Sequence, residues 1–305
     1  MTSPVNGLVL GAATGFKPEA LQVFLNSLDN TGYKGATVLL VHDTDRDLAA
    51  WLQSRGVRVF SLPATQQINP TAFPSPKRLS QTGRYLPRFL RRRLIDPLAL
   101  QRLHICYARF LHFNLYLQRH RREFSHVFLT DTRDVVFQAN PLTALQNFGH
   151  DLCFFLENTG IPIEKEPFNR GTVLSVYGPD GLEKIGHQPV ICSGTVGGGT
   201  SQVLAFLDCL SRQILRRLKI LYKCSYGDQA VHNWAAWTGK LPPHRKLPNF
   251  QGPVATLATA DSSRFQFNAD GLLLNDDRSI IPVLHQYDRH PELHDLVQKL
   301  AQATP

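Results

Sequence analysis

The N-terminal part of the chain alternates between short apolar runs and amphipathic segments. Gly7–Gly11, Ala36–His42 and Val57–Leu62 are apolar runs of strand type, each about the length of one buried strand. Lys17–Leu28 has apolar residues at helical spacing, and Asp47–Gly56 also has the pattern of a helix. Strands that alternate with helices indicate a parallel α/β sheet, whose ligand site is expected outside the carboxyl ends of the strands.

The same kinds of pattern continue beyond residue 97. The further predicted elements are helices at Leu98–Arg119, Ser201–Leu221, Gly227–Trp237 and Pro291–Ala301, and strands at His126–Leu129, Asp151–Leu156, Val190–Gly197 and Ile280–His285. The chain has no internal repeat and no clear linker, so we expect residues 1–305 to form one domain of the α/β class.

Residues 63–97 interrupt this alternation with six prolines and a basic, polar composition, which predicts a long loop or a partly ordered insertion. Within it, residues 84–93 read RYLPRFLRRR, so Arg91–Arg93 are three consecutive cations beside aromatic side chains. Such a segment can attract phosphates or hold a protein at an anionic membrane surface, and it can equally be a solvated loop. No nucleic-acid-binding motif accompanies it, so no nucleic-acid partner is expected.

Composition is that of an ordinary globular protein, with 43% hydrophobic and 19% charged residues and a net charge of +9. The five cysteines lie far apart without a CxxC pair, which argues against a zinc ribbon or a redox centre. Several lie in apolar runs, and a reducing cytoplasm suits them best. The start MTSPVNG lacks the features of a signal peptide, and no run approaches the about 18 apolar residues of a membrane span. We therefore expect a cytoplasmic protein, with peripheral membrane contact through Arg91–Arg93 as an option.

The run His126–Pro141, HVFLTDTRDVVFQANP, carries the clearest chemistry in the chain. An apolar strand leads into Asp131 and Asp134, and a second apolar run follows. Two carboxylates at a strand end repel one another unless a cation lies between them, and a divalent metal held by few protein oxygens usually shares a phosphate-bearing substrate. The alternative is a charged turn between two strands, in which Arg133 pairs with a neighbour.

Four local motifs, in this order, resemble those of the GT-A glycosyltransferases, most closely the retaining family-eight type that includes glycogenin and bacterial galactosyltransferases. They are YARFLHFNLYL (Tyr107–Leu117), the aspartate run FLTDTRDVVFQANP, CSGTVGGG (Cys192–Gly199), and DQAVHN followed by the late His285. The resemblance covers most of the chain. It implies one GT-A-like catalytic domain with a mixed, mainly parallel sheet and a nucleotide-sugar site at the strand carboxyl ends.

The resemblance also implies a Mn²⁺ or Mg²⁺ cofactor held by Asp131, Asp134 and His285. The family's motif is Asp-x-Asp, whereas this chain has Asp-Thr-Arg-Asp, so alignment from the apolar residues places Thr132 on the first aspartate. A small bulge at the strand end would return Asp131 to the site. An imidazole ligand would favour Mn²⁺ over Mg²⁺, and the alternative for His285 is a surface or hydrogen-bonded histidine.

The remaining site residues come from the same resemblance. Those implied to contact the donor are Ala12, Ala13, Thr14, Arg109, Thr132, Ser193, Gly194 and Arg289, and those implied to lie beside the reacting sugar are Asp228 and Gln229. Arg109 could contact the diphosphate, hold a metal-site carboxylate, or be an exposed helix charge. The glycine-dense segment from residue 193 could form a tight turn, and Asp228 could be a helix N-cap.

Three functions follow as hypotheses. The first is a metal-dependent glycosyltransferase (hexosyltransferase-like) that moves a sugar from a nucleotide-sugar donor to an acceptor glycan or lipid-linked sugar. The resemblance implies retention of the configuration at the sugar's anomeric carbon, and it implies a UDP-sugar as the donor. The second is a nucleotidyltransferase, although the loop GAATGF has no basic residue before Lys17. The third is a catalytically inactive binding protein on the same fold.

Overall fold

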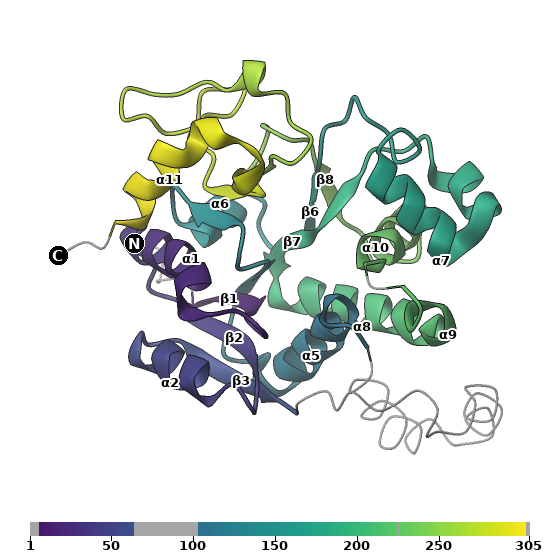
Figure 1. The fold of residues 1–305 in the computed structure, drawn as a ribbon, viewed down its shortest axis with the longest axis horizontal. Coiled ribbons are helices and arrows are strands. Elements are labelled where there is room, and N and C mark those ends of the chain that lie inside the picture. Colours follow the sequence, from purple (N-terminus) through teal and green to yellow (C-terminus); the bar gives the residue numbers. More distant parts are fainter. Residues whose placement is uncertain (1–5, 64–102, 225, 303–305) are drawn as a thin grey trace.

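A seven-stranded sheet is the central element of the computed structural model, which describes residues 6–63, 103–224 and 226–302 (Figure 1). Its strands lie in the order β3-β2-β1-β4-β7-β6-β8. They are β1 (Gly7–Ala12), β2 (Ala36–His42), β3 (Arg58–Leu62), β4 (His126–Thr130), β6 (Cys153–Leu156), β7 (Ile191–Gly199) and β8 (Arg245–Leu247). Strand β7 runs antiparallel to β4 and β6, and the other pairs are parallel. The predicted α/β class with a mixed, mainly parallel sheet is therefore confirmed.

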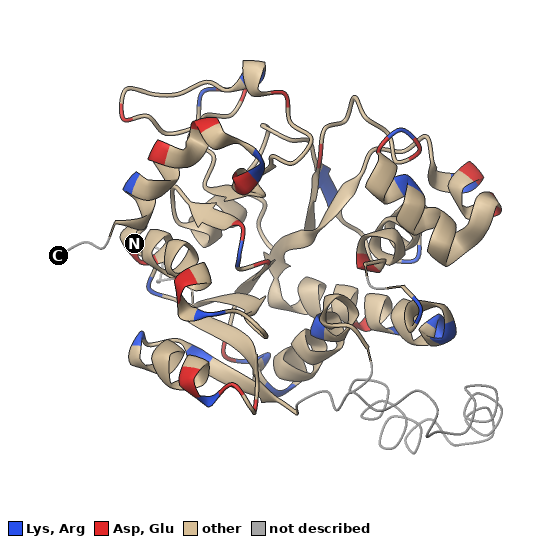
Figure 2. Ribbon diagram, in the orientation of Figure 1, with Lys and Arg blue, Asp and Glu red and all other residues tan. Residues whose placement is uncertain are grey.

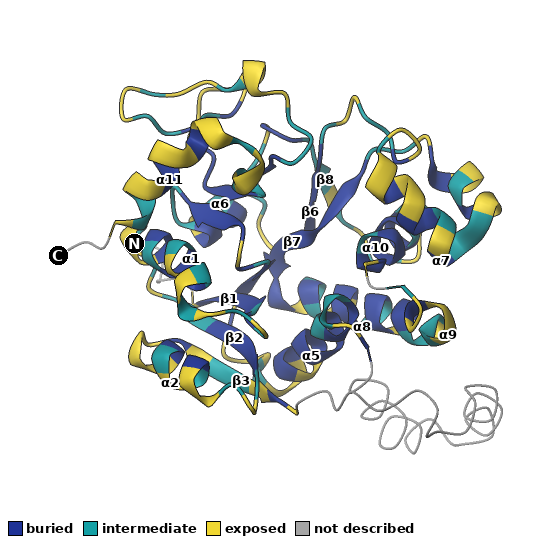
Figure 3. Ribbon diagram, in the orientation of Figure 1, coloured by how far each residue is buried: buried dark blue, intermediate teal, exposed yellow. Residues whose placement is uncertain are grey.

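Helices cover both faces of this sheet, because neighbouring residues of its strands point to opposite sides. Leu8 and Leu10 of β1 belong to the core on one face, whereas Val9 belongs to the core on the other. The first core is formed with α5 (Ile105–His120), α7 (Pro167–Ile185), α8 (Thr200–Arg216) and α10 (Asp228–Trp237). The second is formed with α1 (Pro18–Asn30), α2 (Arg46–Ser54) and α6 (Pro141–Gln146) (Figure 3). Within the described parts of the chain, no helix combines the length and apolar character needed to cross a bilayer.

A second, three-stranded sheet stands beside the first and carries part of the site described below. It consists of β5 (Val135–Phe137), β9 (Val254–Thr256) and β10 (Val283–His285), in the order β5-β10-β9. Strand β10 is antiparallel to β5 and parallel to β9. One face of this sheet packs against α11 (His294–Ala301) in a third core. Only residues 131–134 separate β4 from β5, so this short connection joins the two sheets.

Most predicted elements are present, with differences at their ends. The helix predicted at Leu98–Arg119 begins at Ile105, and the one predicted to Leu221 ends at Arg216, where Arg217 leaves helical geometry before α9 (Leu218–Leu221). The strand predicted at Ile280–His285 contains Pro282, and only its last three residues form β10. Residues 64–97 of the predicted insertion, including Arg91–Arg93, lie outside the described residues.

Helix α7 was not predicted. Its sequence contains three glycines and Pro179, which lower helix propensity, and the helix is kinked at Gly178, where φ is 71°. The apolar face of α7 nevertheless packs into the first core through residues such as Val173 and Val176. Tertiary packing therefore stabilises a helix that the local sequence disfavours.

The order of the strands defines where a ligand can bind. From β1, the chain adds β2 and β3 on one side and then returns to place β4 on the other side. In open α/β sheets, ligands bind at such a reversal, outside the carboxyl ends of the two strands that flank it, here β1 and β4. Asp131 directly follows β4, and Ala13 and Thr14 directly follow β1. The aspartate run thus lies at the switch point of the sheet.

Asn233 fixes α10 to the first residue of β7. Its buried amide accepts from the Ile191 N–H at 2.8 Å and donates to the Ile191 carbonyl at 2.8 Å and to the Gln229 carbonyl at 2.9 Å. The change Asn233→Ala would leave both backbone groups of Ile191 unpaired. We predict that it lowers the free energy of unfolding by about 3 kcal/mol, since each unpaired buried group costs ~1–3 kcal/mol.

Denaturant unfolding measures this loss. Asn147, an exposed residue beyond α6, is the matched control, and Asn147→Ala should change stability by less than about 0.5 kcal/mol. Equal unfolding midpoints for the two variants would contradict the assigned role of Asn233.

Candidate metal centre and its surroundings

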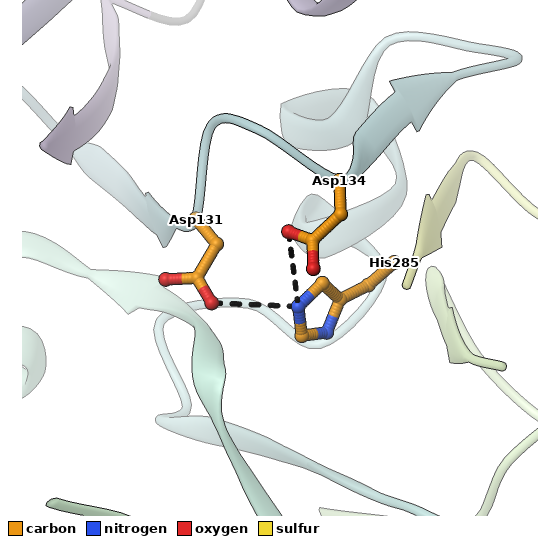
Figure 4. A group of neighbouring side chains, drawn as sticks. All are labelled: Asp131, Asp134 and His285. Atoms are coloured by element: carbon orange, nitrogen blue, oxygen red, sulfur yellow. Dashed lines mark ion pairs between the residues drawn. The ribbon is translucent and has the colours of Figure 1, made fainter. Parts of the chain in front are cut away.

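Two neighbouring aspartates and a histidine that is distant in the sequence converge at the switch point (Figure 4). Asp131 and Asp134 belong to the connection between β4 and β5, and His285 ends β10. One ligand atom from each lies within 4.8 Å of those of the other two. The His285 Nε2 atom is 3.5 Å from Asp131 Oδ2 and 3.8 Å from Asp134 Oδ1. Two carboxylates and one imidazole therefore face a common point.

The backbone holds the two aspartates in place from both sheets. The Asp131 N–H donates to the Gly194 carbonyl at 2.8 Å, which extends the pairing of β4 with β7 by one residue. On the other side, the Gln286 N–H donates to the Asp134 carbonyl at 2.7 Å, with Gln286 in the left-handed region at φ 57°. The aspartates therefore meet across a bend between two sheets, rather than through a bulge within one strand.

The His285 side chain is oriented for a cation. It is 1% exposed, and its Nδ1 atom lies 3.3 Å from Cys192 Sγ and 3.5 Å from Thr256 Oγ1. Its Nε2 atom faces the carboxylates and has no hydrogen-bond partner in the structure. A proton on Nδ1, donated to one of these neighbours, leaves the Nε2 lone pair free as a metal ligand. The donor set fits a divalent cation, and its mixture of hard oxygens and one imidazole suits Mn²⁺ better than Mg²⁺.

Gly194 gives the three ligands their space. A Cβ atom at this position would lie 2.6 Å from Asp131 Oδ2, 2.6 Å from His285 Cε1 and 2.9 Å from His285 Nε2. The next glycines of β7 have other neighbours, since a Cβ at Gly197 would meet Leu145 and one at Gly199 would meet His150. Of these three glycines, only Gly194 borders the metal centre, and the other two allow close packing of a buried strand.

Electrostatics of the cation-free centre favour a proton on the imidazole. Burial by itself lowers the pKa of His285, but Cys192 and the two aspartates outweigh it and hold the pKa well above its ordinary value. Burial raises the pKa of Asp131, and the Arg109 and His285 charges overcome that effect, so its net pKa is lowered. Burial raises the pKa of Asp134. A metal ion would take the place of the proton between these groups.

Arg109 supports the centre from α5. Its guanidinium forms ion pairs with Asp131 and, at 3.0 Å, with Asp228, and it is largely buried. Asp228 also accepts a hydrogen bond from the Ser193 hydroxyl at 3.0 Å. Although Asp228 is the first residue of α10, its side chain does not cap the helix. Arg109 thus holds a carboxylate of the metal centre, which is one of the roles expected for it, and Asp228 joins its network.

Gln229 is joined through Ser193 to the network of Arg109 and Asp228. Its Nε2 donates to Glu157 and to Asn169, each at 2.9 Å, and its Oε1 accepts from Ser193 at 3.3 Å. Burial raises the pKa of Glu157 to about 7. Sequence reasoning missed Glu157 and Asn169. Glu157 had a usable signal, because it ends the apolar run DLCFFLE as Asp131 ends HVFLT, whereas Asn169 comes from the unpredicted helix α7.

The other predicted donor-site residues lie around the centre without joining it. The Thr132 hydroxyl donates to the Ala12 carbonyl at 2.7 Å, so this side chain is turned toward β1 and away from His285. Thr14 follows at the end of β1, beyond the buried Ala13. Arg289, in a short 3₁₀ helix after β10, has a side chain that is 54% exposed.

The chain matches no protein-family model, and it matches no curated protein. Functional inference therefore rests on the residues of the metal centre and on their surroundings.

The first prediction from the site concerns pH. Because the pKa of His285 is raised in the fold, its protonated form contributes to the free energy of unfolding when no cation is bound. This contribution is fully present below about pH 6.5 and is lost as the pH rises through the raised pKa. A cation replaces that proton, so stabilisation by Mn²⁺ should grow as the pH rises above about 6.5 and through the raised pKa of His285. At a hundredfold excess over Kd, the rise in Tm above the raised pKa should be about 5 °C. Thermal unfolding at a series of pH values measures it.

His285→Ala should remove most of the stabilisation by Mn²⁺ together with its pH dependence, whereas His294→Ala, at an exposed position in α11, should retain both. A His285→Ala variant with the same pH-dependent Mn²⁺ effect as the unmodified protein would exclude His285 as a ligand.

The second prediction concerns space at Gly194. Gly194→Ala would push a methyl group against Asp131 and His285, so Mn²⁺ affinity, measured by calorimetric titration, should fall at least tenfold, on the order of the losses caused by disturbing the support of metal ligands. Gly252→Ala is the control, because its Cβ would make an ordinary 3.4 Å contact with Leu247. Indistinguishable affinities for the two variants would show that the cation binds elsewhere.

Proposed function

We propose that the protein is a metal-dependent glycosyltransferase, which moves a sugar from a nucleotide-diphosphate donor to an acceptor. The observation that carries the proposal is the cluster of Asp131, Asp134 and His285 at the switch point of a mainly parallel sheet. Switch points of this kind receive nucleotides and other phosphate-bearing ligands. The same geometry supports the GT-A-like arrangement that the sequence motifs imply.

In this proposal, the donor diphosphate lies at a cation held by Asp131, Asp134 and His285. A divalent cation bound there supplies Lewis-acid stabilisation of the negative charge that develops on the departing diphosphate. Arg109 holds Asp131 in place and lowers its pKa, and Arg133 lies 3.2 Å from Asp134, where it opposes the rise in pKa that burial causes. Ala13 and Thr14 directly follow the neighbouring strand β1, and we place the nucleotide part of the donor there.

The side chains next to the cluster suit a sugar. Ser193, Asp228, Gln229, Glu157 and Asn169 present hydroxyl, carboxylate and amide groups in one connected network. Groups of this kind hydrogen-bond to vicinal hydroxyls, and their mutual contacts fix their orientation before a ligand arrives. Gln229, the partly exposed member, is the group that we place against the reacting face of the sugar.

Asp228 is poorly suited to act as a base. Its Oδ2 atom already accepts hydrogen bonds from Arg109 and Ser193, so this carboxylate is engaged in holding these two groups. This supports a retaining reaction in which the leaving diphosphate accepts the proton of the acceptor hydroxyl. In that reaction, Asp228 positions Arg109 and Ser193, and Gln229 steadies the positively charged sugar in the transition state.

The test is donor turnover in the presence of Mn²⁺. With a panel of nucleotide sugars, UDP-sugars first, the protein should slowly release the nucleotide even without an acceptor. Asp131→Asn and Asp134→Asn should each lower this rate at least about a hundredfold, because Lewis-acid stabilisation contributes several kcal/mol and each 1.4 kcal/mol is tenfold. Asp276→Asn, at an exposed ion pair with Arg264, should leave the rate unchanged.

The alternatives give different results. Exchange of pyrophosphate into a nucleoside triphosphate, without nucleotide release from any sugar donor, would identify a nucleotidyltransferase. Binding of a nucleotide sugar without turnover would identify an inactive binding protein on the same fold. Full activity of the Asp131→Asn and Asp134→Asn variants would refute the assigned centre.

A further inference from the structure

A strongly cationic surface lies away from the metal centre, on the end of α8, on α9 and on the residues that follow. Residues 212–226 contain five arginines and lysines and no aspartate or glutamate. Figure 2 shows this end of α9 in blue. Among the described residues, no carboxylate lies within ion-pairing distance of Arg216, Lys219 or Lys223. The positive charge of this surface is therefore largely uncompensated, and it attracts anions.

The same surface exposes large apolar side chains. Ile220 is 39% exposed, Tyr222 is 40% exposed and Tyr226 is 56% exposed. These are three of seven large hydrophobic residues that are exposed in the described parts of the chain, and they fall within seven positions. Apolar side chains gathered among cations are typical of a surface that lies in the interface of a membrane, where the charges contact head groups and the apolar groups leave water.

A cavity is set into this surface. It has a volume of about 400 Å³ and is lined by Ser175 of α7 and by Lys219, Ile220, Lys223 and Cys224. The two ammonium groups are suitable donors for a phosphate group, whereas the Ser175 hydroxyl already donates to the Gly171 carbonyl at 2.8 Å. An anion in this hollow would therefore contact Lys219 and Lys223, in addition to being attracted by the general charge of the surface.

We propose that this surface, defined as Arg212, Arg216, Lys219, Ile220, Lys223 and Tyr226, docks on an anionic lipid bilayer. The lysines at the cavity would bind the phosphate of a head group, while Ile220 and Tyr226 enter the interface. The exposed apolar side chains favour a bilayer over a soluble polyanion, because contact with a polyanion in water would not bury them. Docking goes beyond the proposed enzymatic function and does not require it.

Tyr107 ties the docking surface to the start of α10. The Tyr107 hydroxyl accepts from the Gly227 N–H at 2.7 Å and donates to the Cys224 carbonyl at 2.9 Å. Gly227 immediately precedes Asp228, which pairs with Arg109 beside the metal centre. A bilayer at α9 would therefore contact a part of the chain that shares a hydrogen-bonding residue with the start of α10.

Sedimentation with lipid vesicles tests the proposal. The full-length protein should bind vesicles that contain phosphatidylglycerol and phosphatidylcholine, but not vesicles of phosphatidylcholine alone, and the binding should weaken with added salt. The double variant Lys219→Gln/Lys223→Gln should bind about thirtyfold less tightly, from the usual contribution of a basic residue near an anionic surface. Ile220→Ser/Tyr226→Ser should also weaken binding to these vesicles. The binding that this variant retains should still weaken with added salt.

The matched control is Lys34→Gln/Lys299→Gln, which removes two charges beside α1 and in α11, on the other side of the molecule (Figure 1). It should bind anionic vesicles like the unmodified protein, and thermal unfolding should confirm that all variants fold. The proposal is overturned if the Lys219/Lys223 variant binds like this control, or if vesicles with and without phosphatidylglycerol bind equally. Binding to dextran sulfate but to no vesicle would assign the surface to a soluble polyanion and would also overturn it.

Discussion

The ion pairs of Arg109 are the interaction on which the rest of the site depends. One guanidinium on α5 contacts Asp131 at the end of β4 and Asp228 at the start of α10, so three elements meet at one buried charge. Without Arg109, the carboxylates of Asp131 and Asp228 would lose the positive charge that they share. Asp131 would keep its contact with His285. Breaking a buried pair of this kind costs ~3–5 kcal/mol, because the partner is left charged and unsolvated. Cation binding, the orientation of Ser193 and the start of α10 all rely on this one side chain.

Charge compensation also explains why the centre is built from both sheets. The large sheet supplies Asp131 and the backbone carbonyl of Gly194, whereas the small sheet supplies His285. Asp134 belongs to the connection between them. One face of the small sheet packs with α11 in the third core, and its other face shares the second core with the large sheet, so common packing fixes the ligands relative to one another. Such preorganisation reduces the cost of gathering ligands around an ion.

Local pattern was sufficient for most elements and for Asp131 and Asp134, whereas His285 was named as a ligand because of the family resemblance. Apolar runs placed β1, β2, β4 and β7, and Asp131 and Asp134 were conspicuous at a strand end. The sequence does not show that His285 meets them, because this depends on the antiparallel pairing of His285 with Val135, 150 positions away. Glu157 was missed for a different reason. Its function depends on Gln229 and Asn169, and only the packing of α7 against α10 brings these together.

The four-residue connection between β4 and β5 has a further consequence. Because it joins two sheets, a cation held by Asp131 and His285 would link the end of β4 to the end of β10. Any local opening between the sheets would separate these ligands, so the free energy of that opening would rise with cation concentration. The concentration of the cation would then control how long the two sheets stay closed at the metal centre. In the proposed enzyme, it would thereby set the lifetime of a bound donor as well as the reactivity of the donor's phosphates.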